Sequence, residues 1–224
     1  MELVLKGVIF DLAGVLISGS SGEFYQEVRQ KYNFKIDHNL WRDLYNKASA
    51  GAISYAEFVG DMASELSIMP ADLEKKFADI VSNRARIVHE AYDVLFHLQM
   101  LGMRSVILTN NIAEWVRIIE GKFRFKRFIS QILVSATLRV RKPDPKAYLL
   151  AANSIGTPPQ QLVYVGDEDE DIKGARDVGM RTVFIAGEDS LSQYCHYRIW
   201  NLREILKFQM FRQNRVSNRG RFNS

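Results

Sequence analysis

The chain has 224 residues, of which 47% are hydrophobic and 25% are charged, and its formal net charge is +4. This apolar content supports a sizeable core and argues against a disordered chain, and no apolar run approaches the ~20 residues that a membrane-spanning helix needs. The single cysteine, Cys195, excludes an internal disulfide and fits a reducing compartment, so we expect a cytoplasmic protein.

The first segment, MELVLKGVIF, is almost continuously apolar, so it predicts a strand buried on both faces rather than a targeting segment. Similar short apolar runs recur later in the chain, and helical patterns lie between them. The predicted strands cover residues 3–10, 104–109, 131–135, 162–166 and 181–185, and the predicted helices cover residues 88–101, 112–121, 144–155 and 171–178. Alternation of this kind predicts an α/β protein with a Rossmann-like, doubly wound parallel sheet.

Residues 18–86 interrupt this alternation, because they contain helical patterns and no convincing strand. Ser54 and Glu57 fit a capping box at the start of one helix, and Pro70 suits the first turn of another. We therefore predict a helical cap inserted into the sheet domain. The expected division is a core from residues 1–17 and 87–211, a helical cap from residues 18–86, and a tail from residues 212–224.

Polar residues follow four of the predicted strands near their carboxyl ends. These residues are Asp11, Thr109 with Asn110, Lys142, and Asp167 with Asp171. Because parallel strands place ligands outside their carboxyl ends, we expect these side chains to meet at one edge of the sheet. Four such signals on successive strands indicate an active site, whereas any one of them alone would be weak.

Residues 167–171 are five consecutive acids, and such a cluster needs solvation or a neutralising cation. Magnesium uses few protein carboxylates and keeps waters and substrate phosphate as its other ligands. We expect Asp11, Asp167 and Asp171 to form the Mg²⁺ site, with Asp171 placed to orient a metal-bound water. The three acids at 168–170 are interpreted as a solvated turn.

A carboxylate held beside a metal can attack phosphorus and form an aspartyl-phosphate, and this is the role we predict for Asp11. Thr109 is expected to donate its hydroxyl to the phosphoryl oxygens, together with backbone N–H groups near Asn110. Lys142 is expected to offset the negative charge of nucleophile and phosphate in the transition state. The residues therefore predict hydrolysis of a phosphorylated substrate.

The order of these residues, with the phrases RKPDPKAY and VGDEDEDIKGARDVGM, resembles the haloacid dehalogenase superfamily over roughly residues 4–190. The resemblance implies a Rossmann-like core with a helical cap over the active site. Members with an aspartate pair like Asp167 and Asp171 are mostly magnesium-dependent phosphatases. The phrase GAISYAEF resembles the cap of the branch that contains sugar-phosphate phosphatases. The family also uses the backbone carbonyl at the position of Ala13 as a metal ligand.

Ala13 departs from that pattern, because the phosphatase members usually carry an aspartate there that protonates the leaving group and then activates water. One proton-transfer group is typically worth about 10²- to 10⁴-fold in rate. We therefore expect intact binding of magnesium and phosphate but slowed turnover. His38, His89 and His97 are candidates for a substitute, and none is assigned that role.

Two alternatives follow from the same departure. Phosphonoacetaldehyde hydrolases resemble this chain in the D-x-A-G pattern and cleave a C–P bond through a cap lysine. Lys47 lies in the corresponding region, although its surroundings do not match that family's cap motif, and we prefer to interpret it as a solvated helix residue. The other alternative is a catalytically impaired protein that only binds phosphate.

The excess positive charge belongs to the end of the chain. Residues 212–224 contain four arginines and no acid, and without these arginines the chain has 26 basic and 26 acidic residues. We expect this tail to be disordered. It has the charge for weak contact with nucleic acid, but a solvated end is the interpretation we prefer. The predicted partner is a small phosphorylated substrate, and no membrane contact is expected.

Overall fold

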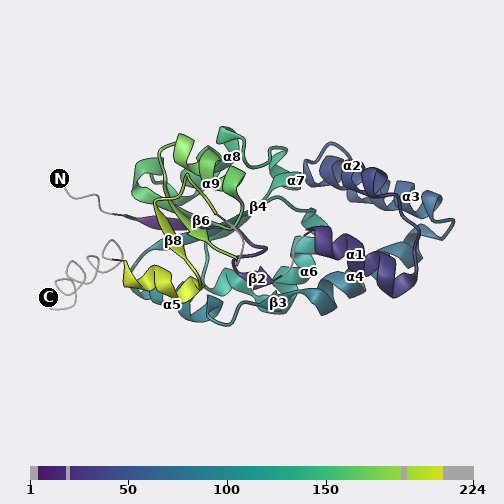
Figure 1. The fold of residues 1–224 in the computed structure, drawn as a ribbon, viewed down its shortest axis with the longest axis horizontal. Helices are drawn as coiled ribbons and strands as arrows, with labels where there is room; N and C mark the ends of the chain where they lie inside the picture. Colours follow the sequence, from purple (N-terminus) through teal and green to yellow (C-terminus); the bar gives the residue numbers. More distant parts are fainter. Residues whose placement is uncertain (1–4, 19–20, 188–190, 209–224) are drawn as a thin grey trace, which may run out of the picture.

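A six-stranded parallel sheet organises the computed structural model, which describes residues 5–18, 21–187 and 191–208 (Figure 1). The strand order is β5-β4-β1-β6-β7-β8, and each neighbouring pair is parallel. The strands are β1 (Gly7–Phe10), β4 (Arg104–Thr109), β5 (Gln131–Val134), β6 (Leu162–Gly166), β7 (Arg181–Ile185) and β8 (Tyr197–Ile199). This topology confirms the predicted doubly wound α/β sheet.

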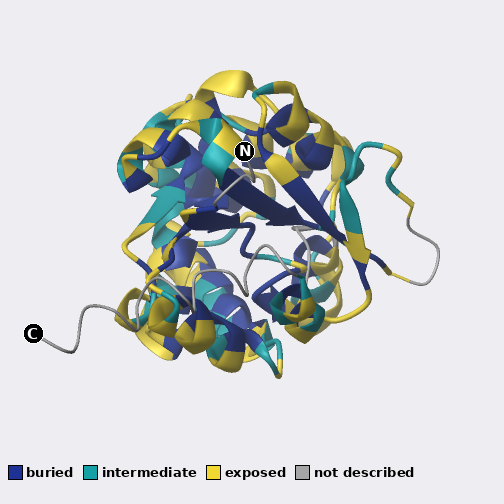
Figure 2. Ribbon diagram, turned by 90° about the vertical axis from the view of Figure 1, so that its left-hand side faces the viewer, coloured by how far each residue is buried: buried dark blue, intermediate teal, exposed yellow. Residues whose placement is uncertain are grey.

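Helices cover both faces of the sheet, and the strands between them are buried (Figure 2). Alternate residues of a strand point to opposite faces, so Phe10 joins the apolar cluster of one face and Ile9 that of the other. The first face packs against α5 (Ala91–Met100), α6 (Ala113–Phe123) and the 3-10 helix Leu202–Lys207. The second packs against α8 (Pro145–Ile155) and α9 (Asp169–Asp177). Shorter helices are α7 (Ser135–Leu138) and the 3-10 turns Phe125–Arg127 and Pro159–Gln161.

Four helices are inserted after the first strand, at the end of the molecule toward which β1 points (Figure 1). They are α1 (Ser21–Tyr32), α2 (His38–Ser49), α3 (Tyr55–Glu65) and α4 (Pro70–Arg84). The chain enters and leaves this insert through β2 (Ile17–Ser18) and β3 (Arg86–Ile87), which pair antiparallel. This two-stranded ribbon was not predicted, because two residues are too few for a periodicity signal.

Trp115 packs the inserted helices against the sheet domain. It belongs to α6, yet its ring lies among the aromatic side chains of the insert, with centroid distances of 4.3 Å to Phe24, 5.9 Å to Phe77 and 6.0 Å to Phe58. Aromatic pairs of this kind contribute about 0.5–1.5 kcal/mol each beyond their buried area. Because α6 directly follows the loop at the end of β4, the insert is packed against that loop.

The predicted helix starts of the insert are confirmed. The Ser54 hydroxyl accepts a hydrogen bond from the Glu57 backbone N–H at 3.1 Å, and the Glu57 carboxylate accepts one from the Ser54 N–H at 2.7 Å. Pro70 is the first residue of α4, where its missing N–H is not needed. Local sequence signals therefore set the boundaries of these helices.

The predicted strands at 104–109, 162–166 and 181–185 coincide with β4, β6 and β7. The strand predicted for residues 3–10 is observed from Gly7, and residues 1–4 lie outside the described part of the chain. The predicted tail at 212–224 also lies outside it. β8 was not predicted, because this edge strand has only three residues. Within the described ranges, no helix is long and apolar enough to cross a membrane.

Candidate active site

The carboxyl ends of three adjacent strands bring the predicted site residues together. Thr109 ends β4, and Asp11 and Asp167 directly follow β1 and β6. With Lys142, from the loop before α8, they line a cavity of about 290 Å³ between the sheet edge and the inserted helices. Asp11, Thr109 and Lys142 are all buried, with 7%, 2% and 4% of their surfaces exposed.

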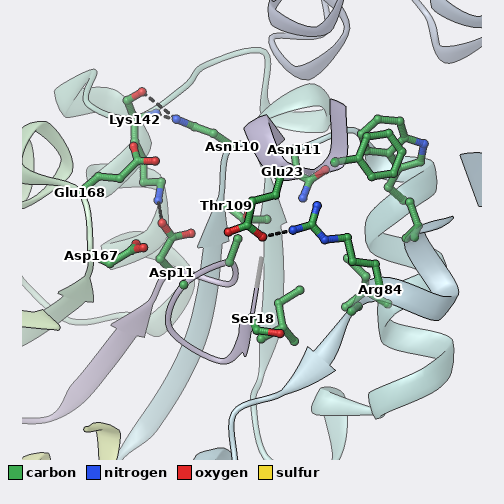
Figure 3. A pocket seen from close by; sticks show the side chains of 18 of the residues that line it. Asp11, Ser18, Glu23, Arg84, Thr109, Asn110, Asn111, Lys142, Asp167 and Glu168 are labelled. Atoms are coloured by element: carbon green, nitrogen blue, oxygen red, sulfur yellow. Dashed lines mark hydrogen bonds and ion pairs between the residues drawn. The ribbon is translucent and has the colours of Figure 1, made fainter. Parts of the chain in front are cut away.

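Lys142 is the centre of a buried polar network. Its ammonium contacts Asp11 Oδ2 at 2.6 Å and Asp171 Oδ2 at 2.7 Å, and it donates to the Tyr164 hydroxyl at 2.9 Å. Tyr164 in turn donates to Asp171 Oδ2 at 3.3 Å. The network fixes the ammonium beside Asp11 (Figure 3), which is where positive charge is needed if phosphate binds at that carboxylate.

Asn110 holds the backbone of Lys142 through two hydrogen bonds. Its amide nitrogen donates to the Lys142 carbonyl, and its amide oxygen accepts from the Lys142 N–H, both at 2.9 Å. The side chain of Asn110 is therefore occupied in joining the loop after β4 to the loop before α8. A contribution of Asn110 to phosphate binding would have to come from its backbone.

The ammonium of Lys142 contacts two carboxylates, those of Asp11 and Asp171, and Asp167 is a third carboxylate at the same cavity. Burial alone would lower the pKa of Lys142, but Asp11 and Asp171 outweigh it and raise that pKa to about 12. Burial raises the pKa of Asp11 against the attraction of Lys142. Burial, followed by repulsion from Asp11 and Glu168, raises the pKa of Asp167 to about 7. The site thus carries more negative charge than its lysine can balance.

The donor set fits magnesium. Asp167 and Asp11 lie side by side at the sheet edge (Figure 3), and the excess negative charge there favours a hard divalent cation. Asp171 Oδ2 is already engaged by Lys142 and Tyr164. Among the residues that the structure describes, no three acidic, histidine or cysteine side chains form a ready metal cluster. A site with one or two protein carboxylates is typical of magnesium, which retains waters and substrate phosphate.

Gly14 makes the close approach of Asp167 possible. Its φ is +75°, a left-handed conformation that glycine adopts without strain. A Cβ atom at this position would overlap the Asp167 carboxylate. The loop after β1 therefore requires glycine both for its backbone conformation and for the space that Asp167 occupies.

Replacing Gly14 by alanine is expected to destabilise the fold by about 1–2 kcal/mol through left-handed strain and to displace Asp167, which weakens magnesium binding. Thermal unfolding and calorimetric magnesium titration measure the two effects. Gly121→Ala is the matched control, because a Cβ at this helical position meets nothing within 4 Å. Unchanged magnesium affinity in Gly14→Ala would mean that Asp167 does not bind the ion.

The wall contributed by the insert was not predicted from the sequence. The Tyr45 hydroxyl donates to the Asn110 carbonyl at 3.4 Å, and Arg141 donates to the Asn46 amide oxygen at 2.9 Å, so α2 contacts the loops on both sides of the site. Glu23 and Arg84 also line the cavity. No local signal marks them, because their proximity depends on the packing of α1 against α4.

Ala13 lines the cavity and forms an isolated β-bridge with Ile17. None of the described residues that line the cavity is a histidine. Lys47 pairs with Asp43 at 2.7 Å on the exposed face of α2, and it is absent from the lining as well. The described part of the insert therefore places no lysine in the cavity.

The carboxyl edge of the parallel sheet presents a strand-end aspartate, a buried lysine and a second carboxylate, and it faces helices inserted after the first strand. This is a ligand site of the Rossmann-like class. The chain belongs to the family described as haloacid dehalogenase-like hydrolases, whose sequence pattern matches residues 8–185. This confirms the superfamily that the motifs resemble.

Two proteins to which the chain is similar in sequence are phosphatases. A phosphoglycolate phosphatase of Xanthomonas campestris is 28% identical over 182 residues, which cover 80% of this chain and 81% of the relative. A glyceraldehyde 3-phosphate phosphatase of Methanopyrus kandleri is 35% identical over 94 residues, 41% of this chain and 40% of the relative.

A solved structure supports the same fold. An aspartate-to-alanine variant of a haloacid dehalogenase family enzyme from Bacteroides thetaiotaomicron, in complex with magnesium and inorganic phosphate, has a TM-score of 0.70 and 18% identity. The match covers 84% of this chain and 97% of that one. The Rossmann-like architecture is therefore shared well beyond the level of sequence similarity.

Proposed function

We propose that the chain is a magnesium-dependent phosphatase of a small phosphorylated metabolite, with Asp11 as nucleophile. The observation that carries this proposal is the buried contact of 2.6 Å between Asp11 and Lys142 in a cavity that Thr109 and Asp167 also line. The phosphatase relatives and the size of the cavity, near the lower end of the range for small-molecule sites, support a small substrate.

In the proposed reaction a carboxylate oxygen of Asp11 attacks phosphorus, and the bond from phosphorus to the ester oxygen breaks. The Leu12 N–H, 2.7 Å from Asp11 Oδ1, and the Lys142 ammonium orient the nucleophile. Because Ala13 offers no proton, the leaving oxygen takes its proton from water. A water molecule then attacks the aspartyl-phosphate, which releases inorganic phosphate and restores the Asp11 carboxylate.

Asp11, Asp167 and the backbone carbonyl of Ala13 are the groups that would hold Mg²⁺. Bound there, the ion would neutralise the carboxylates and polarise the phosphoryl oxygens. Asp171 would act mainly by holding Lys142, which it contacts at 2.7 Å. Thr109 would donate its hydroxyl to the phosphoryl group. We propose that the inserted helices act as the cap over this reaction.

Turnover of an activated aryl phosphate tests the proposal. We expect inorganic phosphate to be released slowly, only with magnesium present, and to stop when the metal is chelated. No release from a folded, magnesium-loaded protein would instead favour a phosphate-binding protein without turnover. A C–P cleavage reaction through a cap lysine has less support, because Lys47 is ion-paired on the exposed face of α2.

Replacing Asp167 by alanine is expected to weaken magnesium binding by at least about 10- to 100-fold. Loss of a residue that only supports a metal ligand already lowers metal affinity by that factor, and Asp167 is proposed as a ligand itself. Glu168→Ala is the matched control: Glu168 is exposed, and its loss should change the affinity little. Calorimetric titration measures both. Equal losses would mean that the acidic run binds the ion diffusely.

The same titration should depend on pH. Because the pKa of Asp167 is raised to about 7 in the metal-free protein, protons compete with the ion for this carboxylate. Lowering the pH through that value should therefore weaken magnesium binding, and raising it should strengthen binding. An affinity that stays constant across this range would argue against Asp167 as a ligand.

A further inference from the structure

Arg84 and Glu23 form an ion pair that lines the cavity. Arg84 is the last residue of α4, and its side chain is 19% exposed. Its Nη2 is ion-paired with Glu23, and its Nε lies 3.3 Å from the Glu27 carboxylate. Its Nη1 is buried and has no hydrogen-bond partner in the described part of the chain. Because Nη1 is closed off from the cavity, a ligand would meet Arg84 through the rest of its guanidinium, beside the Glu23 carboxylate, whose side chain is 61% exposed.

Arg84 lies on the side of the cavity opposite Lys142, and the Glu23 carboxylate lies between Arg84 and Asp11 (Figure 3). At about 30 Å³ for each water-sized group, a cavity of 290 Å³ holds on the order of ten such groups. A phosphoryl group at Asp11, together with Mg²⁺ and its waters, would take at least half of them. The remaining space suits a short substrate group of at most about five non-hydrogen atoms, which would extend toward Arg84.

The charges around Arg84 define what that group can be. Glu23 and Glu27 already neutralise its single positive charge, so a substrate carboxylate would meet two like charges there. Arg141, the other arginine of the lining, keeps its charge because its partner, the Asn46 amide oxygen, is neutral, so the exclusion of a carboxylate applies at Arg84. A hydroxyl group avoids this conflict, because it can accept from Arg84 and donate to the Glu23 carboxylate.

We propose that Arg84 and Glu23 form the subsite for the organic part of the substrate, and that this subsite takes a short, neutral, hydroxylated group and rejects a carboxylate. The inference rests on the proposed function, because it needs the phosphoryl group at Asp11. Arg84 and Glu23 are specificity-determining residues in this arrangement. Glu27, which is not part of the cavity lining, only holds Arg84 in place.

Binding of two esters of similar size tests the subsite: glycerol phosphate, which is hydroxylated, and phosphoglycolate, which is carboxylated. Calorimetry with magnesium on the Asp11→Asn protein measures affinity without turnover. We expect at least about tenfold tighter binding of glycerol phosphate. Arg84→Met should weaken it about 10- to 100-fold, the loss expected for a hydrogen bond to a charged group. Glu23→Gln should improve the relative binding of phosphoglycolate.

Two controls separate recognition from stability. Arg117→Met removes an arginine that is 73% exposed and paired with Glu114, and it should change neither affinity. Glu27→Gln removes the support of Arg84 at 3.3 Å and should alter the melting temperature more than the ratio of the two affinities. If Arg84→Met does not fold, the Glu23→Gln ratio still decides.

Tighter binding of phosphoglycolate by the parental site, or an unchanged ratio in Glu23→Gln, would overturn the proposed subsite. Failure of the proposed function is a separate result: neither ester would bind at Asp11, and the parental chain would not hydrolyse an aryl phosphate. A further outcome is loss of turnover on all esters in Glu23→Gln, with a shifted pH profile and unchanged affinities. That would make Glu23 an acid–base group and overturn the subsite.

Discussion

Replacing Asp11 by asparagine is expected to reduce turnover of an aryl phosphate by at least about 10³-fold, because an amide cannot form the aspartyl-phosphate. The side chain keeps its shape, and the amide oxygen can still accept from the Leu12 N–H at 2.7 Å. The loss should therefore appear in kcat more than in substrate affinity. Steady-state rates, with mass spectrometry to detect deamidation, measure it.

The fold should tolerate this change. Lys142 loses one carboxylate but keeps Asp171 at 2.7 Å and the Tyr164 hydroxyl at 2.9 Å. Destabilisation should stay below the about 3–5 kcal/mol that follows when a buried charge loses its partner. Glu168→Gln, which neutralises an exposed carboxylate at the same cavity, is the matched control. Near-parental activity of freshly purified Asp11→Asn would exclude Asp11 as the nucleophile.

The architecture of the sheet could be predicted because its strands are short apolar runs with clear ends. RSVILT at 104–109 and LVYVG at 162–166 became β4 and β6 without a shift. β8 (Tyr197–Ile199) was not predicted, because it is too short to give a clear apolar run. It is an edge strand of three residues, and only its pairing with β7 reveals it. Short elements stabilised by neighbours leave little trace in local sequence.

The phosphate end of the site could be predicted because each residue follows a strand. Asp11, Thr109 and Asp167 reach the same sheet edge through the parallel topology alone. The partners of Lys142 were not predictable in this way. In the sequence Tyr164 is indistinguishable from the other apolar residues of its strand. Its hydroxyl accepts a hydrogen bond from Lys142 because α8 and α9 pack on that face of the sheet.

The position of Arg84 at the cavity could not be predicted from the sequence. Arg84 looks like any basic residue in the last turn of a helix, where the helix dipole favours positive charge. Its contacts with Glu23 and Glu27 join residues of α1 and α4 that are more than fifty positions apart in sequence. The sequence motifs therefore predicted the residues proposed for catalysis. The residues proposed to recognise the substrate come together only through tertiary packing, which the motifs do not predict.

Ala13 decides how fast the proposed reaction can be. A poor leaving group must depart nearly unprotonated when the neighbouring side chain supplies no proton, whereas an aryl oxide leaves easily. Hydrolysis of the aspartyl-phosphate should also slow, because the attacking water lacks a base. We therefore expect slow turnover of aryl phosphates, slower turnover of alkyl phosphates, and accumulation of phosphorylated Asp11. Intact-protein mass spectrometry after rapid acid quench detects this intermediate.

Ala13→Asp should restore the missing proton transfers. Ala13 lines the cavity, and its backbone is outside the left-handed region, so an aspartate can be accommodated without φ strain. Alkyl phosphates should gain more than aryl phosphates, by up to about 10²- to 10⁴-fold, and phosphorylated Asp11 should no longer accumulate. Ala13→Asn is the control, because it adds the same bulk without a titratable proton. If Ala13→Asp speeds no phosphate ester, then either another group already transfers these protons or the natural reaction is not ester hydrolysis.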